Sequence, residues 1–142
     1  MKQMRIFLDA NILVAVLNKE YPLYTYAARV LSLASNQGYK LYVSPLSLAI
    51  AAYFSAKKSG KELATKKISL LIKHIHLTSI TESEVKQALE NKQVTDFEDG
   101  MQYYSAKAVG CTAIVTEDVG DYYFSEIPVY TARAFLHSLA KG

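Results

Sequence analysis

The chain has 142 residues, about the size of one domain, and 51% of them are hydrophobic, so it can bury a core without disulfides or a structural metal. Its only cysteine, Cys111, excludes an internal disulfide and favours a reducing, cytoplasmic location. The formal net charge of +3 is too small to indicate a nucleic-acid ligand by itself.

The sequence predicts no membrane segment and no leader. No run approaches the roughly 20 apolar residues that cross a bilayer. Residues 1–5 are followed by only three apolar residues before Asp9, which is too few for a signal peptide. We therefore expect a single domain over residues 1–142, located in the cytoplasm.

The first elements are a strand and two helices. Residues 4–8 form an apolar run that predicts a buried strand, and Asp9 then suits the N-cap region of a helix through residue 17. Pro22 suits the first turn of a second helix. We expect Gly38 to close that helix in the left-handed region.

The next segment predicts a strand and two more helices. Residues 41–43 form the second strand, and Ser44 then caps a helix that has proline at its first position and stops near Gly60. Residues 61–72 are amphipathic, with leucines and isoleucines on one side and lysines on the other.

The second half of the sequence continues the alternation of predicted strands and helices. Residues 76–78 predict a weak third strand, and Thr81 with an acid three residues later resembles a capping box. Residues 95–98, a threonine with an acid three residues later, form a similar start for a helix that reaches about residue 109, and Gly110 ends it. Residues 112–115 form an apolar, β-branched fourth strand, as expected where both faces of a sheet are covered.

The C-terminal part predicts the last strand and helix. Residues 127–130 form the fifth strand, where Pro128 favours an edge position, and Thr131 caps a helix through residue 139. Strands that alternate with helices indicate a three-layer α/β/α domain with a central, mainly parallel sheet of about five strands. Ligands of such sheets bind beyond the carboxyl ends of the strands.

Three aspartates fall where that rule places a ligand. Asp9 follows the first strand, Asp118 follows the fourth, and Asp99 lies in the first turn of the helix that leads into the fourth. Clustered carboxylates repel one another unless a cation neutralises them, and ligands that are all oxygen favour Mg²⁺ or Mn²⁺ over zinc. The sequence therefore predicts a divalent-metal site.

Each acid also has a simpler interpretation. Asp9 would serve as a helix cap, and Asp99 as a favourable charge near a helix N-terminus. Asp118 and Asp121 would be turn residues. The placement of the whole set at the ends of strands is what favours the metal site.

Basic side chains crowd a different part of the sequence, where Glu62 is the one acid. A basic arm beside an acidic centre is what metal-dependent cleavage of a polyanion requires, although a solvated helix face is the alternative. We expect the following lysines to bind an RNA backbone: Lys57, Lys58, Lys61, Lys66 and Lys67.

The ordered motifs resemble those of PIN domains. Residues 7–13, an apolar strand followed by Asp-x-Asn, resemble the family's opening motif. Residues 44–49 resemble the run before its second motif, residues 99–106 its third, and residues 114–122 its fourth. The resemblance covers nearly the whole chain in the right order.

The resemblance implies a PIN-like fold that cleaves RNA phosphodiester bonds with Mg²⁺ or Mn²⁺. Small members of the family are often toxin ribonucleases of the VapC type, which commonly dimerise and are held in check by an antitoxin protein. Asp9, Asp99 and Asp118 fall on the family's acidic, metal-binding and catalytic positions. Asn11 and Thr116 fall on its supporting polar positions, and Asp121 is an auxiliary acid.

One position departs from the family pattern. Ile50 stands where the family usually has a glutamate, and no acid occurs between Ala49 and Gly60. An isoleucine neither binds metal nor hydrogen-bonds to water. Glu98 beside Asp99, or Asp96 one helical turn before it, would have to compensate.

Three rival interpretations remain. A PIN-like module that has lost catalysis and binds nucleic acid or protein would explain Ile50. A receiver-type signalling domain also has acids at strand ends, but no lysine follows the fourth-strand motif before Arg133. A purely structural partner protein would use the basic helices as its docking face.

Overall fold

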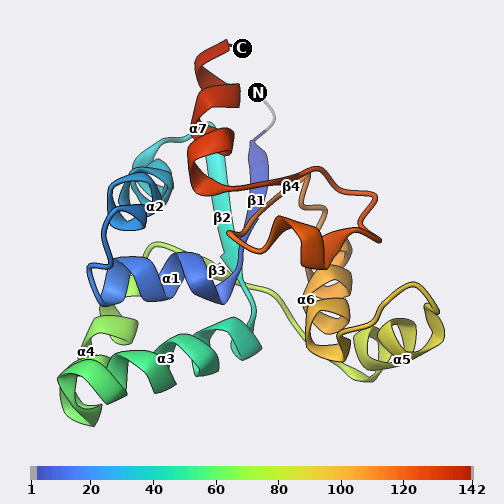
Figure 1. Cartoon of the computed structure of the whole chain (residues 1–142), viewed down its shortest axis with the longest axis horizontal. Coiled ribbons are helices and arrows are strands. Elements are labelled where there is room, and N and C mark those ends of the chain that lie inside the picture. Colours follow the sequence, from blue (N-terminus) through green and yellow to red (C-terminus); the bar gives the residue numbers. More distant parts are fainter. Residues whose placement is uncertain (1–2, 142) are drawn as a thin grey trace.

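Five short parallel strands form the centre of the molecule, and helices cover both faces of the sheet (Figure 1). The computed structural model describes residues 3–141. The elements in chain order are β1 (Met4–Leu8), α1 (Ala10–Leu17), α2 (Leu23–Ser32), the 3-10 helix η1 (Leu33–Ser35), β2 (Tyr39–Val43), α3 (Pro45–Ser59), α4 (Lys61–Leu71), β3 (His76–Leu77), α5 (Glu82–Glu90), α6 (Phe97–Ala108), β4 (Ala113–Val115), the 3-10 helix η2 (Val119–Tyr122), β5 (Val129–Tyr130) and α7 (Ala132–Lys141).

The strand order places β1 at the centre of the sheet. The order is β3-β2-β1-β4-β5, so the chain builds one side of the sheet from β1 to β3 and then returns to add β4 and β5 on the other side. In register, Phe7 of β1 pairs with Tyr42 of β2 and with Ile114 of β4. The direction of winding therefore reverses between β1 and β4, which is where sheets of this kind bind their ligands.

Alternation along β1 divides the core into two layers. Ile6 and Leu8 pack into a cluster with residues of α1, α2, α3 and α7, whereas Phe7 packs on the opposite face with Tyr103 of α6. Residues 6–8 of β1 and all of β4 are buried on both faces, which explains why these strands read as continuous apolar runs. The predicted α/β/α architecture is confirmed.

Helix α6, which carries Asp99, is held at both ends. Asp96 caps it by accepting a hydrogen bond from the Glu98 amide at 3.0 Å. Gly100 lets α5 approach closely, since a Cβ there would meet the Val94 side chain at 2.7 Å and Ala88 Cβ at 3.0 Å. Gly110 follows α6 with a φ of 77°, a left-handed conformation that glycine adopts without strain.

Most of the other predicted helix caps, and the predicted edge strand, are confirmed. Thr81 and Glu84 form the predicted capping box, in which the Glu84 carboxylate accepts from the Thr81 amide at 2.7 Å. The Thr131 hydroxyl accepts from the Ala134 amide at 3.1 Å, and β5, which follows Pro128, is an edge strand.

The prediction for Gly38 is wrong. Helix α2 ends at Ser32, continues as η1, and does not reach Gly38, whose φ is not positive. The Asn36 side chain instead accepts a hydrogen bond from the Gly38 amide at 2.8 Å and turns the chain into β2.

No helix within residues 3–141 combines the length and the apolar character needed to cross a bilayer.

Candidate active site

Asp9 occupies the centre of the site, directly after β1. Its amide donates to the Val115 carbonyl at 3.0 Å, which joins the ends of β1 and β4. One carboxylate oxygen accepts from the Ala10 amide at 2.7 Å, and the other accepts from the Thr116 hydroxyl at 2.8 Å. Asp9 is 7% exposed and caps α1 at the same time. The cap interpretation is therefore correct, and it leaves the carboxylate fixed in orientation.

Thr116 links Asp9 to Asp118. Besides donating to Asp9, its hydroxyl accepts from the Asp118 amide at 3.0 Å and from the Asn11 side-chain amide at 3.1 Å. The same Asn11 nitrogen lies 3.2 Å from Asp118 Oδ2, and its oxygen accepts from the Glu117 amide at 3.1 Å. Asn11 and Thr116 thus orient two aspartates from strands that are far apart in the sequence.

A buried polar chain reaches Asp9 from the other side. Gln102 of α6 is 1% exposed, and its amide nitrogen donates to Asp9 Oδ1 at 3.4 Å. Its amide oxygen accepts from the hydroxyls of Ser44 and Ser47, at 3.2 Å from Ser44. This contact was not predicted from the sequence, although a glutamine one turn after Asp99 on a buried helix face is the signal that would have found it.

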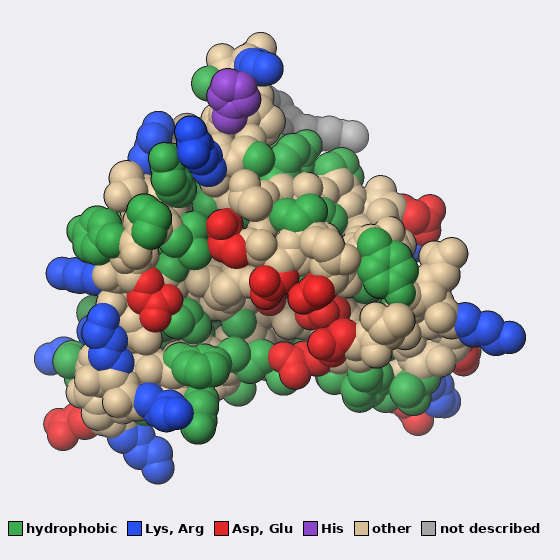
Figure 2. Space-filling view, viewed as in Figure 1, with side chains coloured by type: hydrophobic (Ala, Val, Ile, Leu, Met, Phe, Trp, Pro, Cys, Tyr) green, Lys and Arg blue, Asp and Glu red, His purple; other side chains and the backbone are tan. Residues whose placement is uncertain are grey.

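The predicted acids surround one cavity of about 490 Å³. Figure 2 shows acidic side chains gathered on this face, around the start of α1 and the start of α6. The structure brings together at this cavity every acid that the sequence analysis singled out: Asp9, Asp96, Glu98, Asp99, Asp118 and Asp121.

Burial and mutual repulsion shift the titration of these acids. Burial, followed by the charges of Asp96, Asp9, Asp121 and Glu98, raises the pKa of Asp99 from 3.8 to about 7. Burial is also the main cause that raises the pKa of Asp9 and of Glu98. Without a cation, burial and mutual repulsion therefore disfavour the ionised form of these carboxyl groups.

A tyrosine hydroxyl is buried beside these carboxylates. Tyr122 of η2 is 2% exposed, and its hydroxyl has no hydrogen-bond partner among the described residues. Burial and the nearby charges of Asp9 and Asp99 raise the pKa of Tyr122 well above its usual value. It remains a neutral hydroxyl next to the acids.

Two further residues of the cavity lining bear on the site. Ile50 of α3 is one of them, so the departure from the family pattern falls inside the site. Glu20, from the connection between α1 and α2, lines the same cavity and was missed by the sequence analysis. It follows a short loop outside every recognised motif, so only the folded chain shows that it faces the site.

The predicted RNA-binding lysines lie on α3 and α4, outside the cavity lining. Lys67 donates to the Leu17 carbonyl at 3.0 Å, and Lys58 donates to the Asn18 carbonyl. These two amines therefore satisfy carbonyls at the C-terminal end of α1. Lys57 lies over the Tyr53 ring at 5.4 Å.

The acids border the cavity without forming a compact ligand cage. Among residues 3–141, no three histidine, cysteine, aspartate or glutamate side chains are grouped so that they could hold one metal ion together. Mg²⁺ commonly keeps several of its waters and takes only one or two protein carboxylates. The arrangement thus suits a largely hydrated ion.

Residues 5–120, which include this network, match the family model for the PIN domain. The chain belongs to the PIN-domain family. The match contains the segments of Asp9, Asp99 and Asp118, and it ends just before Asp121.

Individual relatives of this PIN domain are distant in sequence. It is 25% identical over 139 residues to "Ribonuclease VapC1" of Aquifex aeolicus (strain VF5), covering 95% of each chain. Its fold is similar to that of a chain in VapBC2 from Rickettsia felis, with a TM-score of 0.65 and 21% identity, over 89% of this chain and 97% of the other. It is equally similar to Mycobacterium tuberculosis VapC20, described as a sarcin-ricin loop cleaving toxin, with a TM-score of 0.65 and 16% identity, over 87% and 98%.

Proposed function

We propose that this PIN domain is an Mg²⁺- or Mn²⁺-dependent endoribonuclease and the toxin of a toxin–antitoxin pair. The observation that carries the proposal is that Asp9, Asp99 and Asp118 line one cavity at the carboxyl ends of β1 and β4. The full-length relationship to a protein named as a ribonuclease supports the same reaction.

The residues of the cavity fit a hydrated divalent ion. The donors are carboxylate oxygens, which hard cations prefer, and burial together with neighbouring negative charges raises the pKa of Asp99. The unpartnered Tyr122 hydroxyl beside them would gain a partner in the water shell of such an ion. Of Asp9, Asp99 and Asp118, one or two would hold the ion directly, and the rest would contact the waters that it keeps.

The residues of this chain have distinct tasks in the proposed reaction. When bound, the ion supplies an activated water for attack on the phosphodiester and offsets charge on the phosphate. Thr116 and Asn11 hold the carboxylates of Asp9 and Asp118 in place, and Gln102 supports Asp9 from α6. Asp96, Glu98 and Asp121 add negative charge that draws the cation into the cavity.

Cleavage of RNA tests this proposal. Wild type and Asp9→Asn would be incubated with labelled RNA in Mg²⁺, in Mn²⁺ and in a chelator, with folding confirmed by circular dichroism. We expect cleavage by wild type only, and only with metal. Equal cleavage by both proteins, or cleavage in the chelator, would refute the mechanism.

A second candidate function is a PIN domain that binds nucleic acid or protein without cutting. Ile50 favours it, because this aliphatic side chain takes up part of the cavity lining where the family usually places a glutamate. Titration calorimetry with Mn²⁺ separates the two. Tight binding that Asp99→Asn abolishes supports the enzyme, whereas no binding by wild type supports the module.

The partner proteins belong to the same proposal. An antitoxin encoded beside this chain should co-purify with it and suppress its cleavage of RNA. The expected homodimer and the cytoplasmic location stay predictions, and light scattering of the purified protein tests the first.

A further inference from the structure

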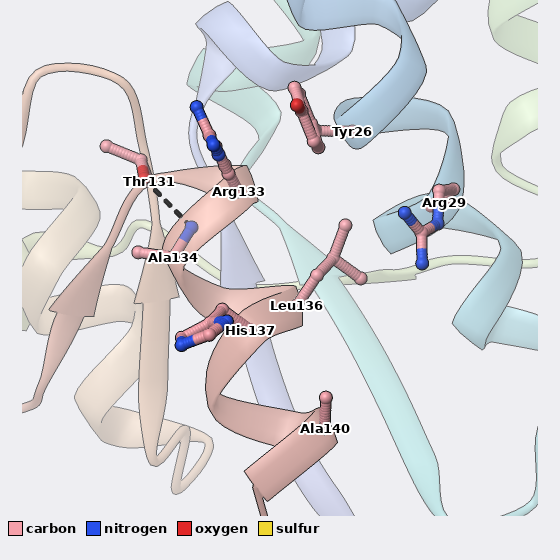
Figure 3. Close-up of a pocket in the computed structure, with 8 residues that line it drawn as sticks. All are labelled: Tyr26, Arg29, Thr131, Arg133, Ala134, Leu136, His137 and Ala140. Atoms are coloured by element: carbon pink, nitrogen blue, oxygen red, sulfur yellow. Dashed lines mark hydrogen bonds between the residues drawn. The ribbon is translucent and has the colours of Figure 1, made fainter.

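A groove of about 590 Å³ separates α2 from α7, away from the lining of the acidic cavity. Figure 3 shows Tyr26 and Arg29 on α2, with Leu136 pointing toward that helix from α7. Arg133 points upward beside Tyr26, and the His137 ring lies on the side of α7 away from α2. Its lining combines a leucine and two alanines with two arginines and a histidine.

The groove is basic and its charges are free. Its lining includes no aspartate or glutamate. Among residues 3–141 the ion pairs are Lys86–Glu82 and Lys107–Glu126, so neither Arg29 nor Arg133 is neutralised. Both arginines are exposed, and the Arg133 guanidinium lies 5.8 Å from the centre of the Tyr26 ring. A partner with negative charge and planar groups complements this surface.

The groove and the acidic cavity both border α2. Leu23 lines the cavity and Tyr26, one helical turn later, lines the groove. The start of α7 also lies close to the acidic cavity. The Ala132 amide donates to the Glu117 carboxylate at 2.9 Å, and Glu117 directly precedes Asp118 in the sequence. In Figure 2, basic side chains lie over α2 and α7, on the same face as the acidic patch but apart from it.

We propose that the α2–α7 groove binds the phosphate backbone of the RNA strand where it leaves the acidic cavity. This inference rests on the proposed function. A cavity lined by carboxylates repels the rest of a polyanion even when a cation sits within it, so the substrate needs a cationic surface beside the site. Arg29 and Arg133 would contact phosphates, and Tyr26 offers a face for base stacking.

This assignment differs from the one based on sequence. The lysine-rich stretch of α3 and α4 looked like the backbone-binding surface, yet the amines of Lys58 and Lys67 are engaged by carbonyls of the α1 C-terminus. The arginines come from segments more than 100 residues apart, so no local cluster in the sequence indicates them.

RNA binding by non-cleaving protein tests the groove. The full chain with Asp99→Asn would be titrated against a fluorescent single-stranded RNA over a range of salt concentrations, alone and with Arg29→Gln/Arg133→Gln. We expect the double variant to bind about tenfold more weakly at low salt, with a salt slope smaller by about 1.4, because each phosphate contact on a single strand contributes about 0.7. Arg29→Lys/Arg133→Lys should recover most of the affinity.

The matched control removes two positive charges elsewhere. Lys86→Gln/Lys92→Gln changes exposed residues on α5 and just after it, across the molecule from the groove (Figure 1). Its affinity should stay within about twofold of the parent, since distant surface charges are screened. Thermal unfolding would confirm that all variants are folded.

The outcomes separate this inference from the proposed function. Unchanged affinity and slope in the arginine variant, or an equal loss in the control, would overturn the groove even if wild type cleaves RNA. Weaker binding in the arginine variant would support the groove even if wild type cleaves nothing. Unchanged RNA binding with loss of binding to polyglutamate would overturn it in favour of an acidic protein partner.

Discussion

The side-chain amide of Gln102 connects Asp9 to the start of α3. Its nitrogen lies 3.4 Å from Asp9 Oδ1, and its oxygen accepts from the hydroxyls of Ser44 and Ser47. Residues from β1, from the start of α3 and from α6 are therefore fixed relative to one another by one buried group. The orientation of Asp9 depends on a residue that lies within the segment resembling the third motif, residues 99–106, but that received no role from the sequence.

Gln102→Leu tests this connection at nearly constant volume. We expect kcat for RNA cleavage to fall about 10- to 100-fold, the range found when groups that orient metal ligands are removed, with KM little changed. Stability should fall by about 1–3 kcal/mol, because the two serine hydroxyls lose their acceptor. Steady-state cleavage and denaturant unfolding measure the two effects.

The control for this change is Gln87→Leu, at an exposed glutamine that bonds only to Ser83 in its own helix. It should leave both quantities unchanged. Normal kcat in Gln102→Leu would show that Asp9 needs no support from α6.

Thr116→Val removes the hydroxyl that joins Asp9 to Asp118 while keeping the shape of the side chain. We expect Mn²⁺ affinity to fall about 10- to 100-fold, because both carboxylates lose a shared positioning group. Thr116→Ser keeps the hydroxyl and should restore most of the affinity. Calorimetric titration measures it, and equally weak binding by the serine variant would assign the loss to packing instead.

Asp99 should make stability depend on pH. Its pKa is about 7 in the folded protein and 3.8 ordinarily, so the folded state holds the proton more tightly than the unfolded chain does. The resulting stabilisation is complete below about pH 4 and is lost as the pH rises through about 7. In a chelator, Tm of wild type should therefore fall over this range relative to Tm of Asp99→Asn, which stays neutral.

Metal should reverse that loss. Adding Mn²⁺ above pH 7 should raise Tm of wild type, because binding to the folded state alone adds stability, and should leave Asp99→Asn nearly unchanged. Parallel pH profiles for the two proteins in the chelator would contradict the repulsion inferred around Asp99.

Ile50→Glu adds a carboxylate to the cavity at the position where the family usually has one. We expect Mn²⁺ to bind about tenfold more tightly and cleavage to rise, while the protein without metal becomes less stable because a further like charge joins the cluster. Ile50→Gln is the matched control and should do neither. Weaker metal binding in Ile50→Glu would show that Ile50 packs against neighbours that do not tolerate a carboxylate.

The sequence sufficed for the fold because local and long-range signals agree. β1 and β4 read as continuous apolar runs since both faces are buried, and the caps at Thr81 and Thr131 lie where their side chains suggest. At α6 the cap is Asp96, one residue after the threonine that the sequence suggested. The prediction that Gly38 closes the second helix failed, because the Asn36 side chain forms the turn into β2 by accepting from the Gly38 amide. A glycine after a helical pattern does not reveal which residue closes the helix.

The site was only partly accessible from the sequence. Acids that follow strands could be assigned because parallel strands bring their carboxyl ends to one edge. Glu20 could not, because it lies in an irregular loop, and Gln102 was not assigned because its role depends on buried contacts with Ser44 and Ser47. The α2–α7 groove likewise exists only once both helices are packed together.

The hydrogen bonds of Lys58 and Lys67 change how variants with neutralised lysines should be interpreted. Each amine satisfies a carbonyl at the end of α1 and offsets the negative pole of that helix, whose opposite end carries Asn11. Acetylation or neutral substitution of either lysine would loosen α1 itself. Reduced activity in such a variant would then report a displaced helix rather than weaker binding of RNA by the lysine.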